Sequence, residues 1–171
     1  MERRSVETIA QALNLAGVRF LVAGGMAVVA HGLVRFTADL DLILDPDPAA
    51  LERAVRTLSG LGYGPRAPVS FAAFTDPEQR RRWAAEKDLM VFSLFSGAHK
   101  DTEVDLFLEC PLDFDAAYSR ALRTELPGGP AMTFVSLADL FELKHRAGRP
   151  RDLEDIAGLG SIHPGAGRRN G

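Results

Sequence analysis

The sequence predicts a single α/β (α+β) domain, and two observations indicate it. Short apolar runs of strand length alternate along the chain with segments whose apolar residues recur at helical spacing. The 171 residues, 46% hydrophobic and 25% charged, suffice for one core of an ordinary globular protein. We therefore expect one domain over residues 1–160. The segment 161–171 is glycine-rich, basic and without periodicity, and we expect it to be a mobile tail.

The composition excludes several classes of protein. The single cysteine, Cys110, excludes an internal disulfide and a zinc site built from cysteines. We find neither a signal peptide nor a membrane span in the sequence, so we expect a cytoplasmic protein that does not bind membranes. The formal net charge of −3 argues against nonspecific binding of nucleic acid, although it leaves room for a local basic patch.

The expected elements follow from apolar spacing and boundary residues. Helices are predicted at 6–16, 26–31, 48–60, 77–84, 114–122, 136–147 and 150–159. Strands are predicted at 18–23, 37–44, 69–74, 88–95, 103–108 and 132–135, with 62–64 as loose backbone. Pro48 suits a first helical turn, and Ser136 with Asp139 forms a capping-box pattern. The polar link 96–102 predicts that the strands on either side of it form an antiparallel pair.

A glycine pair interrupts the chain between the first strand and the short helix that follows it. Because Gly24 and Gly25 lack side chains, their backbone N–H groups can approach an anion closely. The N-terminus of the following helix adds a partial positive charge. The turn is therefore a candidate phosphate-binding site, and its alternative interpretation is a tight turn without a ligand.

The strand at 37–44 carries two carboxylates on one face. Alternation along a strand places Asp39 and Asp41 on the same side and Leu40, Leu42 and Leu44 on the other. Two like charges that close repel each other, so a bound cation is the simplest reason for their placement. Mg²⁺ prefers carboxylates, water and phosphate oxygens, and a pair of ions ~3.5–4 Å apart would stabilise a phosphoryl displacement. The alternative is an ordinary edge strand.

A third acid repeats this pattern on a later strand. Asp105 projects opposite to Val104 and Leu106, as Asp39 and Asp41 do relative to their leucines. It is the candidate general base for an incoming hydroxyl group or a ligand of a second metal ion. Glu103 lies on the same strand face and is the substitute candidate for this role. The alternative interpretation of both acids is an ordinary solvated face of the strand.

Three further polar residues are candidates for contact with a triphosphate. Arg35 and Thr37 precede the carboxylates on the same segment, and both could equally be surface residues. Lys144 lies on the apolar helical stripe of Leu137 and Leu140, so it needs an acid or a phosphate partner, or must reach water. The charged segment 149–155 could position Lys144 or cover a nucleotide.

The run 80–83 (Arg-Arg-Arg-Trp) could hold a nucleic-acid strand, or be a solvated helix face with a buried tryptophan.

Together these motifs resemble the nucleotidyltransferase superfamily typified by DNA polymerase β. The resemblance rests on the glycine pair, the spaced residues at 35, 37, 39 and 41, and the strand acid at 105. The pattern LKxxAGRPRDLxDI over residues 143–156 is similar to the end of small bacterial members of the abortive-infection and toxin–antitoxin (AbiEii/MNT-like) type. The resemblance covers most of residues 18–159.

This resemblance implies a mixed sheet flanked by helices, Mg²⁺ (or Mn²⁺) as the cofactor, and an NTP such as ATP as the substrate. Gly24 and Gly25 would hold the triphosphate, with Lys144 neutralising phosphate charge. Asp39 and Asp41 would hold the metal, and Asp105 would assist the acceptor hydroxyl. Many members have serine where this chain has Gly25, which removes a hydroxyl contact but keeps the backbone donors.

The leading hypothesis is a Mg²⁺-dependent enzyme that moves an NMP from an NTP to a hydroxyl group of RNA, such as a tRNA end, or of a protein. The setting implied is toxin–antitoxin or phage defence, with a cognate toxin or antitoxin as a partner. The first alternative is a catalytically silent nucleotide-binding or antitoxin module. The second is a nucleotidyltransferase of small molecules such as antibiotics.

Overall fold

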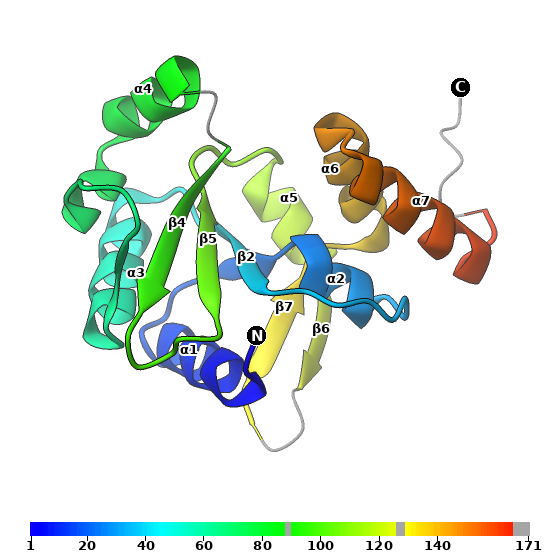
Figure 1. Ribbon diagram of the computed structural model, residues 1–171, viewed down its shortest axis with the longest axis horizontal. Helices are drawn as coiled ribbons and strands as arrows, with labels where there is room; N and C mark the ends of the chain where they lie inside the picture. The colour runs from blue at the N-terminus through cyan, green and yellow to red at the C-terminus, as the bar shows by residue number, and fades with distance from the viewer. Residues whose placement is uncertain (88–89, 126–128, 166–171) are drawn as a thin grey trace.

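The computed structural model describes residues 1–87, 90–125 and 129–165, which fold around one mixed β-sheet (Figure 1). The described residues form seven strands in the order β3-β4-β5-β2-β1-β7-β6. The strands are β1 Phe20–Val22, β2 Asp39–Leu44, β3 Tyr63–Pro65, β4 Val91–Ser96, β5 Glu103–Phe107, β6 Leu122–Glu125 and β7 Ala131–Phe134. The predicted α+β class with a mixed sheet is therefore confirmed.

Helices join these strands largely where the sequence predicts them. They are α1 Arg3–Leu15, α2 Gly24–Ala30, α3 Pro48–Gly60, η1 Phe71–Thr75, α4 Pro77–Lys87, α5 Phe114–Ser119, α6 Leu137–Ala147 and α7 Pro150–Ile162. Pro48 begins α3, and Pro150 begins α7. The predicted cap of α6 is present, because the backbone N–H of Asp139 donates to Ser136 Oγ at 3.2 Å.

The centre of the sheet combines both strand directions. β2 runs antiparallel to β1 and parallel to β5, and β4 and β5 form the predicted antiparallel pair. On β2 the leucines at 40, 42 and 44 are buried, while Asp39 and Asp41 are only partly so. The apolar side of the strand thus fixes β2 in the core and leaves both carboxylates on the opposite face.

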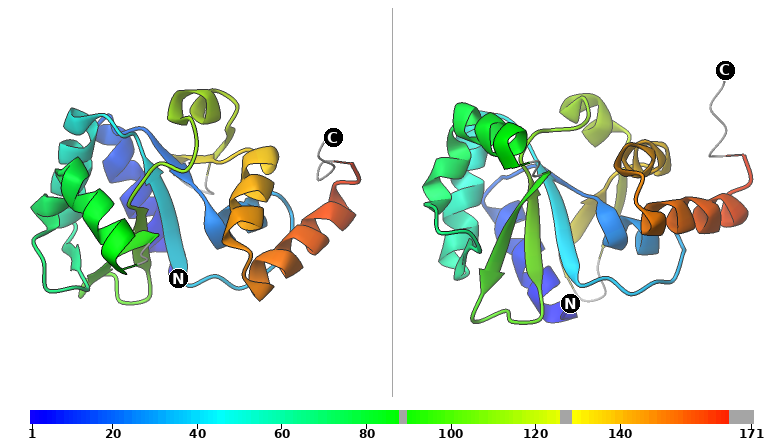
Figure 2. Two further views of the ribbon diagram at one scale, coloured as in Figure 1. Left: turned by 90° about the horizontal axis from the view of Figure 1, so that it is seen from above. Right: turned by 45° about the horizontal axis from the view of Figure 1, so that its top comes forward.

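The helices cover the two sides of the sheet unequally. Figure 2 shows α1 and α3 on one side of β2, and α2, α6 and α7 on the other. α2 contacts β2 and α6, and α6 packs on α7. Among the described elements, no helix is drawn over the near face of β4 and β5 in Figure 1. The carboxylate-bearing face is therefore bounded by helices on the α6–α7 side and open over the β4–β5 pair.

Two of the predicted elements are wrong. Residues 69–74 do not form a strand, because η1 occupies Phe71–Thr75. Phe71 and Phe74 are three residues apart, and their rings lie 6.0 and 5.4 Å from that of Phe92, a packing that favours one tight helical turn. The stretch expected as loose backbone instead contains β3, which pairs antiparallel with β4.

Other boundaries shift by a few residues. The helix predicted over 114–122 ends at Ser119, because Leu122 begins β6, which pairs with β7. The strand predicted from Thr37 begins at Asp39. The strand predicted over 88–95 begins at Val91, and residues 88–89 lie outside the described residues.

The C-terminal helix extends beyond its predicted end. α7 continues to Ile162, so the first two residues of the expected tail are helical. The expectation of mobility falls mainly on residues 166–171, which lie outside the described residues. None of the helices in the described ranges is long and apolar enough to cross a membrane.

Candidate functional site

The three predicted acids come together at the centre of the sheet. The parallel register of β2 and β5 sets Asp41 directly opposite Asp105 and Asp39 opposite Glu103. Directly opposed residues on neighbouring strands project from the same face. Two strands that are some sixty residues apart in the sequence therefore place four carboxylates on the same face of the sheet.

The environment of these carboxylates opposes their ionisation. Burial raises the pKa of Asp41 to about 6, and the negative charges of Asp105 and Asp39 add to the rise. The charge of Arg149 and a hydrogen bond from the Gly25 backbone act in the other direction. The Asp41 carboxyl is thus held in a site that would favour an added positive charge.

Asp105 has a raised pKa for similar reasons. Burial is the largest cause, and the charges of Asp39 and Glu103 add to it, against a hydrogen bond from the Ser93 side chain. Its Oδ1 atom is buried and has no hydrogen-bond partner among the described residues. A buried acceptor without a partner is costly, and a cation or an incoming hydroxyl group would satisfy it.

The glycine pair lies directly against the acids. Gly24 has φ +56°, and a Cβ atom placed there would lie 1.9 Å from Asp41 Oδ2. The backbone N–H of Ala23 donates to the Asp41 carbonyl at 2.9 Å, which holds the turn against β2. Glycine is therefore required at position 24 both for its backbone conformation and for the close approach of the Asp41 carboxylate.

Gly25 is required for a different contact. A Cβ atom at this position would lie 2.4 Å from Thr37 Oγ1 and 3.0 Å from Arg35 Nη2. The side chains of Arg35 and Thr37 therefore turn inward and lie over the glycine backbone. This explains the absence of a serine at position 25, since its Cβ would collide with Thr37.

Lys144 is buried in an ion-pair cluster between α6 and α7. Its Nζ donates to Asp152 Oδ1 at 3.0 Å and to Asp155 Oδ2 at 2.6 Å. Arg35 also pairs with Asp155, and Arg149 Nε donates to Asp152 Oδ2 at 2.7 Å. Three cations thus share two carboxylates among the described residues, and the cluster carries surplus positive charge beside the glycine pair.

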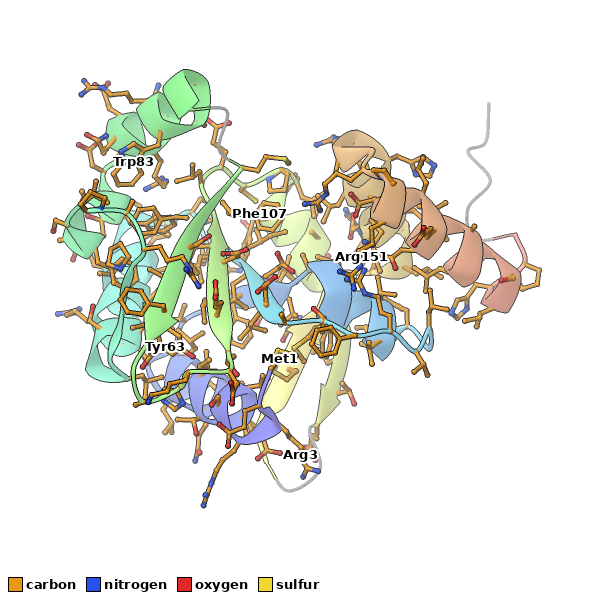
Figure 3. All side chains as sticks on the ribbon, in the orientation of Figure 1. Met1, Arg3, Tyr63, Trp83, Phe107 and Arg151 are labelled. Carbon is orange, nitrogen blue, oxygen red and sulfur yellow. The ribbon has the colours of Figure 1, made fainter. Side chains whose placement is uncertain are left out.

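One cavity of about 320 Å³ lies between the three acids, the glycine pair and Lys144. Its lining includes every predicted site residue: Gly24, Gly25, Arg35, Thr37, Asp39, Asp41, Asp105 and Lys144. Sequence reasoning missed its apolar wall, which is formed by Met90, Val91, Phe107, Pro111, Leu140 and Leu143. Figure 3 shows two of the lining residues, Phe107 on the sheet and Arg151 on the side of α7.

The structure also tests the sequence hypothesis for the nearby run 80–83 (Arg-Arg-Arg-Trp). In the 80–83 run, Trp83 is buried against Phe92 with ring centroids 5.0 Å apart, so its ring is not available to a nucleic-acid base. Arg80 donates to the carbonyls of Leu108 and Phe74. The structural interpretation of this run is the correct one.

The acids also fit a divalent cation of the expected kind. In the described parts of the chain, no three His, Cys, Asp or Glu side chains are grouped closely enough to enclose a metal ion. Mg²⁺ does not require such a cage, because it usually takes one or two carboxylates together with water and substrate phosphates. The unpartnered Asp105 Oδ1 and the raised pKa of Asp41 are consistent with this mode of binding.

Comparison with known proteins gives one family match. A protein-family model described as "Nucleotidyl transferase AbiEii toxin, Type IV TA system" matches residues 10–169. A comparison with curated protein sequences gave no match.

Solved structures show the same fold at low sequence identity. The antibiotic-resistance factor ANT(2'')-Ia is 13% identical with a TM-score of 0.58, over 92% of this chain and 81% of that one. The lincosamide antibiotic adenylyltransferase LnuA, solved with lincomycin, is 16% identical with a TM-score of 0.57, over 95% and 98% of the two chains. A candidate nucleotidyltransferase from Thermotoga maritima is 15% identical with a TM-score of 0.57, over 95% and 97%.

Proposed function

The chain belongs to the AbiEii nucleotidyltransferase toxin family, and from this premise we propose that it moves an NMP from an NTP to a hydroxyl group of RNA with the help of Mg²⁺. The observation that carries the proposal is the position of Asp105. It lies opposite Asp41 in a parallel register and leaves a buried oxygen without a partner at the cavity. A purely structural pair of strands would have no reason to place three partly buried carboxylates beside a glycine pair.

Asp39 and Asp41 would hold the divalent cation, with Asp105 beside them. Mg²⁺ bound there supplies positive charge that neutralises phosphate oxygens and orients the reacting groups. The raised pKa of Asp105 suits it to accept the proton of the acceptor hydroxyl on its free carboxylate oxygen. The Asp105 carboxylate therefore serves as the general base of the transfer or as a metal ligand.

The triphosphate would lie over the glycine pair, next to the acids. The backbone at Gly24 and Gly25 offers close approach, because no side chain covers it. Arg35 and Lys144 belong to the cluster with surplus positive charge and would face the phosphates. Thr37 lies against Gly25 and fixes the strand that follows. Pyrophosphate would leave from this side, where those cations stabilise it.

The charge around the cavity favours RNA as the acceptor. Arg146, Arg149 and Arg151 line the cavity and are exposed, while Asp152 and Asp155 are buried. The surface around the cavity mouth therefore presents guanidinium groups in a protein whose net charge is −3. A polyanion such as a tRNA end is the acceptor that these groups would attract.

One labelling experiment distinguishes RNA from the other acceptors and from a catalytically silent nucleotide-binding module. The protein is incubated with each α-labelled NTP and Mg²⁺ against total RNA, cell lysate and a panel of antibiotics, and the labelled species are identified. Label on RNA supports the proposal. Label on a protein, such as a cognate toxin or antitoxin, or on an antibiotic assigns a different acceptor. Tight NTP binding without label on any acceptor identifies a nucleotide-binding module.

A further inference from the structure

The segment between α2 and β2 turns its residues alternately toward the cavity and toward solvent. Arg35 and Thr37 point inward, where they lie over Gly25. Val34 and Phe36 alternate with them and are 93% and 75% exposed. An aromatic ring this exposed is unusual for a side chain three residues before a buried strand. The inward contacts explain it, because they force the neighbouring side chains outward.

The backbone beneath the Phe36 ring is held from two sides. Its carbonyl accepts hydrogen bonds from Arg35 Nε at 3.2 Å and from Arg151 Nη2 at 2.6 Å. Arg35 is itself tied to Asp155 of α7. The ring is thus presented by a fixed backbone, so little conformational entropy would be lost when a ligand contacts it.

Positive charge lies beside this ring. Arg151 reaches the Phe36 carbonyl, and its neighbour Arg149 has a side chain that is 75% exposed. The α7 carboxylates Asp152 and Asp155, which pair with cations of the ion-pair cluster, are buried. Solvent beside Phe36 therefore meets guanidinium groups and an aromatic face. Proteins that bind single-stranded nucleic acids combine these two features, because bases stack on the ring and phosphates pair with the cations.

We propose that Phe36 is the stacking platform for a base near the 3′ end of a single-stranded RNA acceptor, with Arg149 and Arg151 pairing with its phosphates. The inference rests on the proposed nucleotidyl transfer to RNA and adds the surface that receives the acceptor. Phe36 is three residues from Asp39, a span of at most about 10 Å along an extended chain. The backbone of Phe36 is thus close to that of Asp39, so a strand of a few nucleotides can run from a base stacked on the outward-facing ring to the acids.

The test measures binding of a fluorescently labelled, short single-stranded RNA with a free 3′ hydroxyl group by anisotropy, in low salt. Phe36→Ala is expected to weaken RNA binding about tenfold, the size of one lost stacked base, while Phe36→Trp retains it. Mg²⁺-dependent NTP binding, measured by calorimetry, is expected to stay at the parental value in both variants. Thermal melting checks that each variant folds.

Phe95→Ala is the matched control. Phe95 is the other exposed phenylalanine among the described residues, at 50%, and it lies on β4 across the open side of the sheet. It is expected to bind RNA like the parent. If Phe95→Ala weakens RNA binding and Phe36→Ala does not, the acceptor runs over β4 and the inference is wrong.

Three further results would overturn the inference. One is a parental protein that does not bind the RNA. Another is equal RNA affinity of Phe36→Ala and the parent. The third is a dimer that Phe36→Ala dissociates without change in RNA binding, which would assign the surface to a second copy of the chain. The proposed function fails separately, if the parental protein transfers no label from any NTP.

Discussion

Asp41 and Asp105 face each other across two parallel strands, and each carboxyl is harder to ionise because of burial and nearby negative charge. Within the described ranges neither side chain forms a salt bridge, and Lys144 and Arg35 pair instead with Asp152 and Asp155. The chain thus buries carboxylates at its centre and keeps the neighbouring cations a short distance away. This arrangement is stable only at a cost, which a bound cation would remove.

The first prediction concerns Asp105. Asp105→Asn should lower the rate of nucleotide transfer by about 10²–10⁴, because it removes the group that accepts the proton of the acceptor hydroxyl. Since the pKa of Asp105 is raised, the parental rate should increase with pH as this carboxyl ionises. Steady-state transfer rates over a pH series measure both effects.

Glu103→Gln is the control for this prediction. Glu103 lies on the same strand and the same face, but its carboxylate pairs with Arg66. The rate of nucleotide transfer by Glu103→Gln should differ from that of the parent by less than tenfold. A larger loss in Glu103→Gln than in Asp105→Asn would assign the role to Glu103.

The second prediction concerns stability and pH. The pKa of Asp41 is about 6 in the folded protein against an ordinary value of 3.8, so the folded state binds the proton more tightly than the unfolded state. The protein should therefore lose stability as the pH rises from about 4 to 6, by up to about 3 kcal/mol. Asp41→Asn should remove this loss and raise the free energy of unfolding at pH 7.5 in the absence of metal, with little effect at pH 4.

Mg²⁺ should make the parent more stable than Asp41→Asn, the reverse of their order without metal. It should raise the melting temperature of the parent at pH 7.5 and leave that of Asp41→Asn unchanged, because only the parent has the carboxylate pair that binds it. Chemical denaturation at several pH values with and without Mg²⁺ measures both effects. A parent that is more stable than Asp41→Asn at pH 7.5 without metal would contradict the electrostatic account.

The third prediction tests the glycine pair. Gly25→Ala should destabilise the protein by about 1–3 kcal/mol, because its Cβ would lie 2.4 Å from Thr37 Oγ1 and force the 35–37 segment to move. The affinity for NTP should fall as well. Thr37→Gly in the same chain removes the colliding atoms and should restore part of the lost stability.

Gly60→Ala is the matched control, at the last residue of α3. Apart from its chain neighbours and the backbone of its own helix, no atom of the described residues lies within 4 Å of a Cβ built there. Since alanine is favoured over glycine in helices, this variant should be as stable as the parent or slightly more stable. Equal stability losses in Gly25→Ala and Gly60→Ala would show that crowding against Thr37 is not the cause.

The fourth prediction concerns the buried cluster at Lys144. Lys144→Met should cost about 3–5 kcal/mol in stability, because it leaves buried carboxylates of Asp152 and Asp155 with too few partners. The same substitution made in an Asp155→Asn background should cost less. The difference between the two costs, obtained from urea unfolding, gives the coupling between the residues.

The surface ion pair of Arg146 and Glu142 is the control for the Lys144→Met substitution. It is an exposed ion pair on α6, so Arg146→Met should change stability by less than about 1 kcal/mol. If both substitutions had similar small effects, the cluster around Lys144 would not be the rigid support of the triphosphate site.

The sequence predicts much of this site because its signals are local. The alternation of acids and leucines on β2 determines which side chains share a face, and the glycine pair marks the start of α2, which the structure places beside them. What it does not provide is the register between β2 and β5. The pairing of Asp41 with Asp105 depends on how two distant segments align, which single-sequence periodicity does not encode.

The wrong predictions for residues 62–64 and 69–74 also come from contacts between segments that are distant in the sequence. β3 is three residues long and contains Gly64 and Pro65, so its pairing with β4 holds it in place and its own residues do not favour a strand. Residues 71–74 form a helical turn because their phenylalanines pack on Phe92 of a distant strand. The sequence also does not determine the partner of Lys144, since spacing alone does not distinguish a carboxylate partner from a bound phosphate.

The most direct test is the rate of label transfer from an α-labelled NTP by the double variant Asp39→Asn/Asp41→Asn, compared with the parent at saturating Mg²⁺. We expect the variant to fold, to be at least as stable as the parent without metal, and to transfer no measurable label. Transfer at the parental rate would show that these carboxylates hold no catalytic cation.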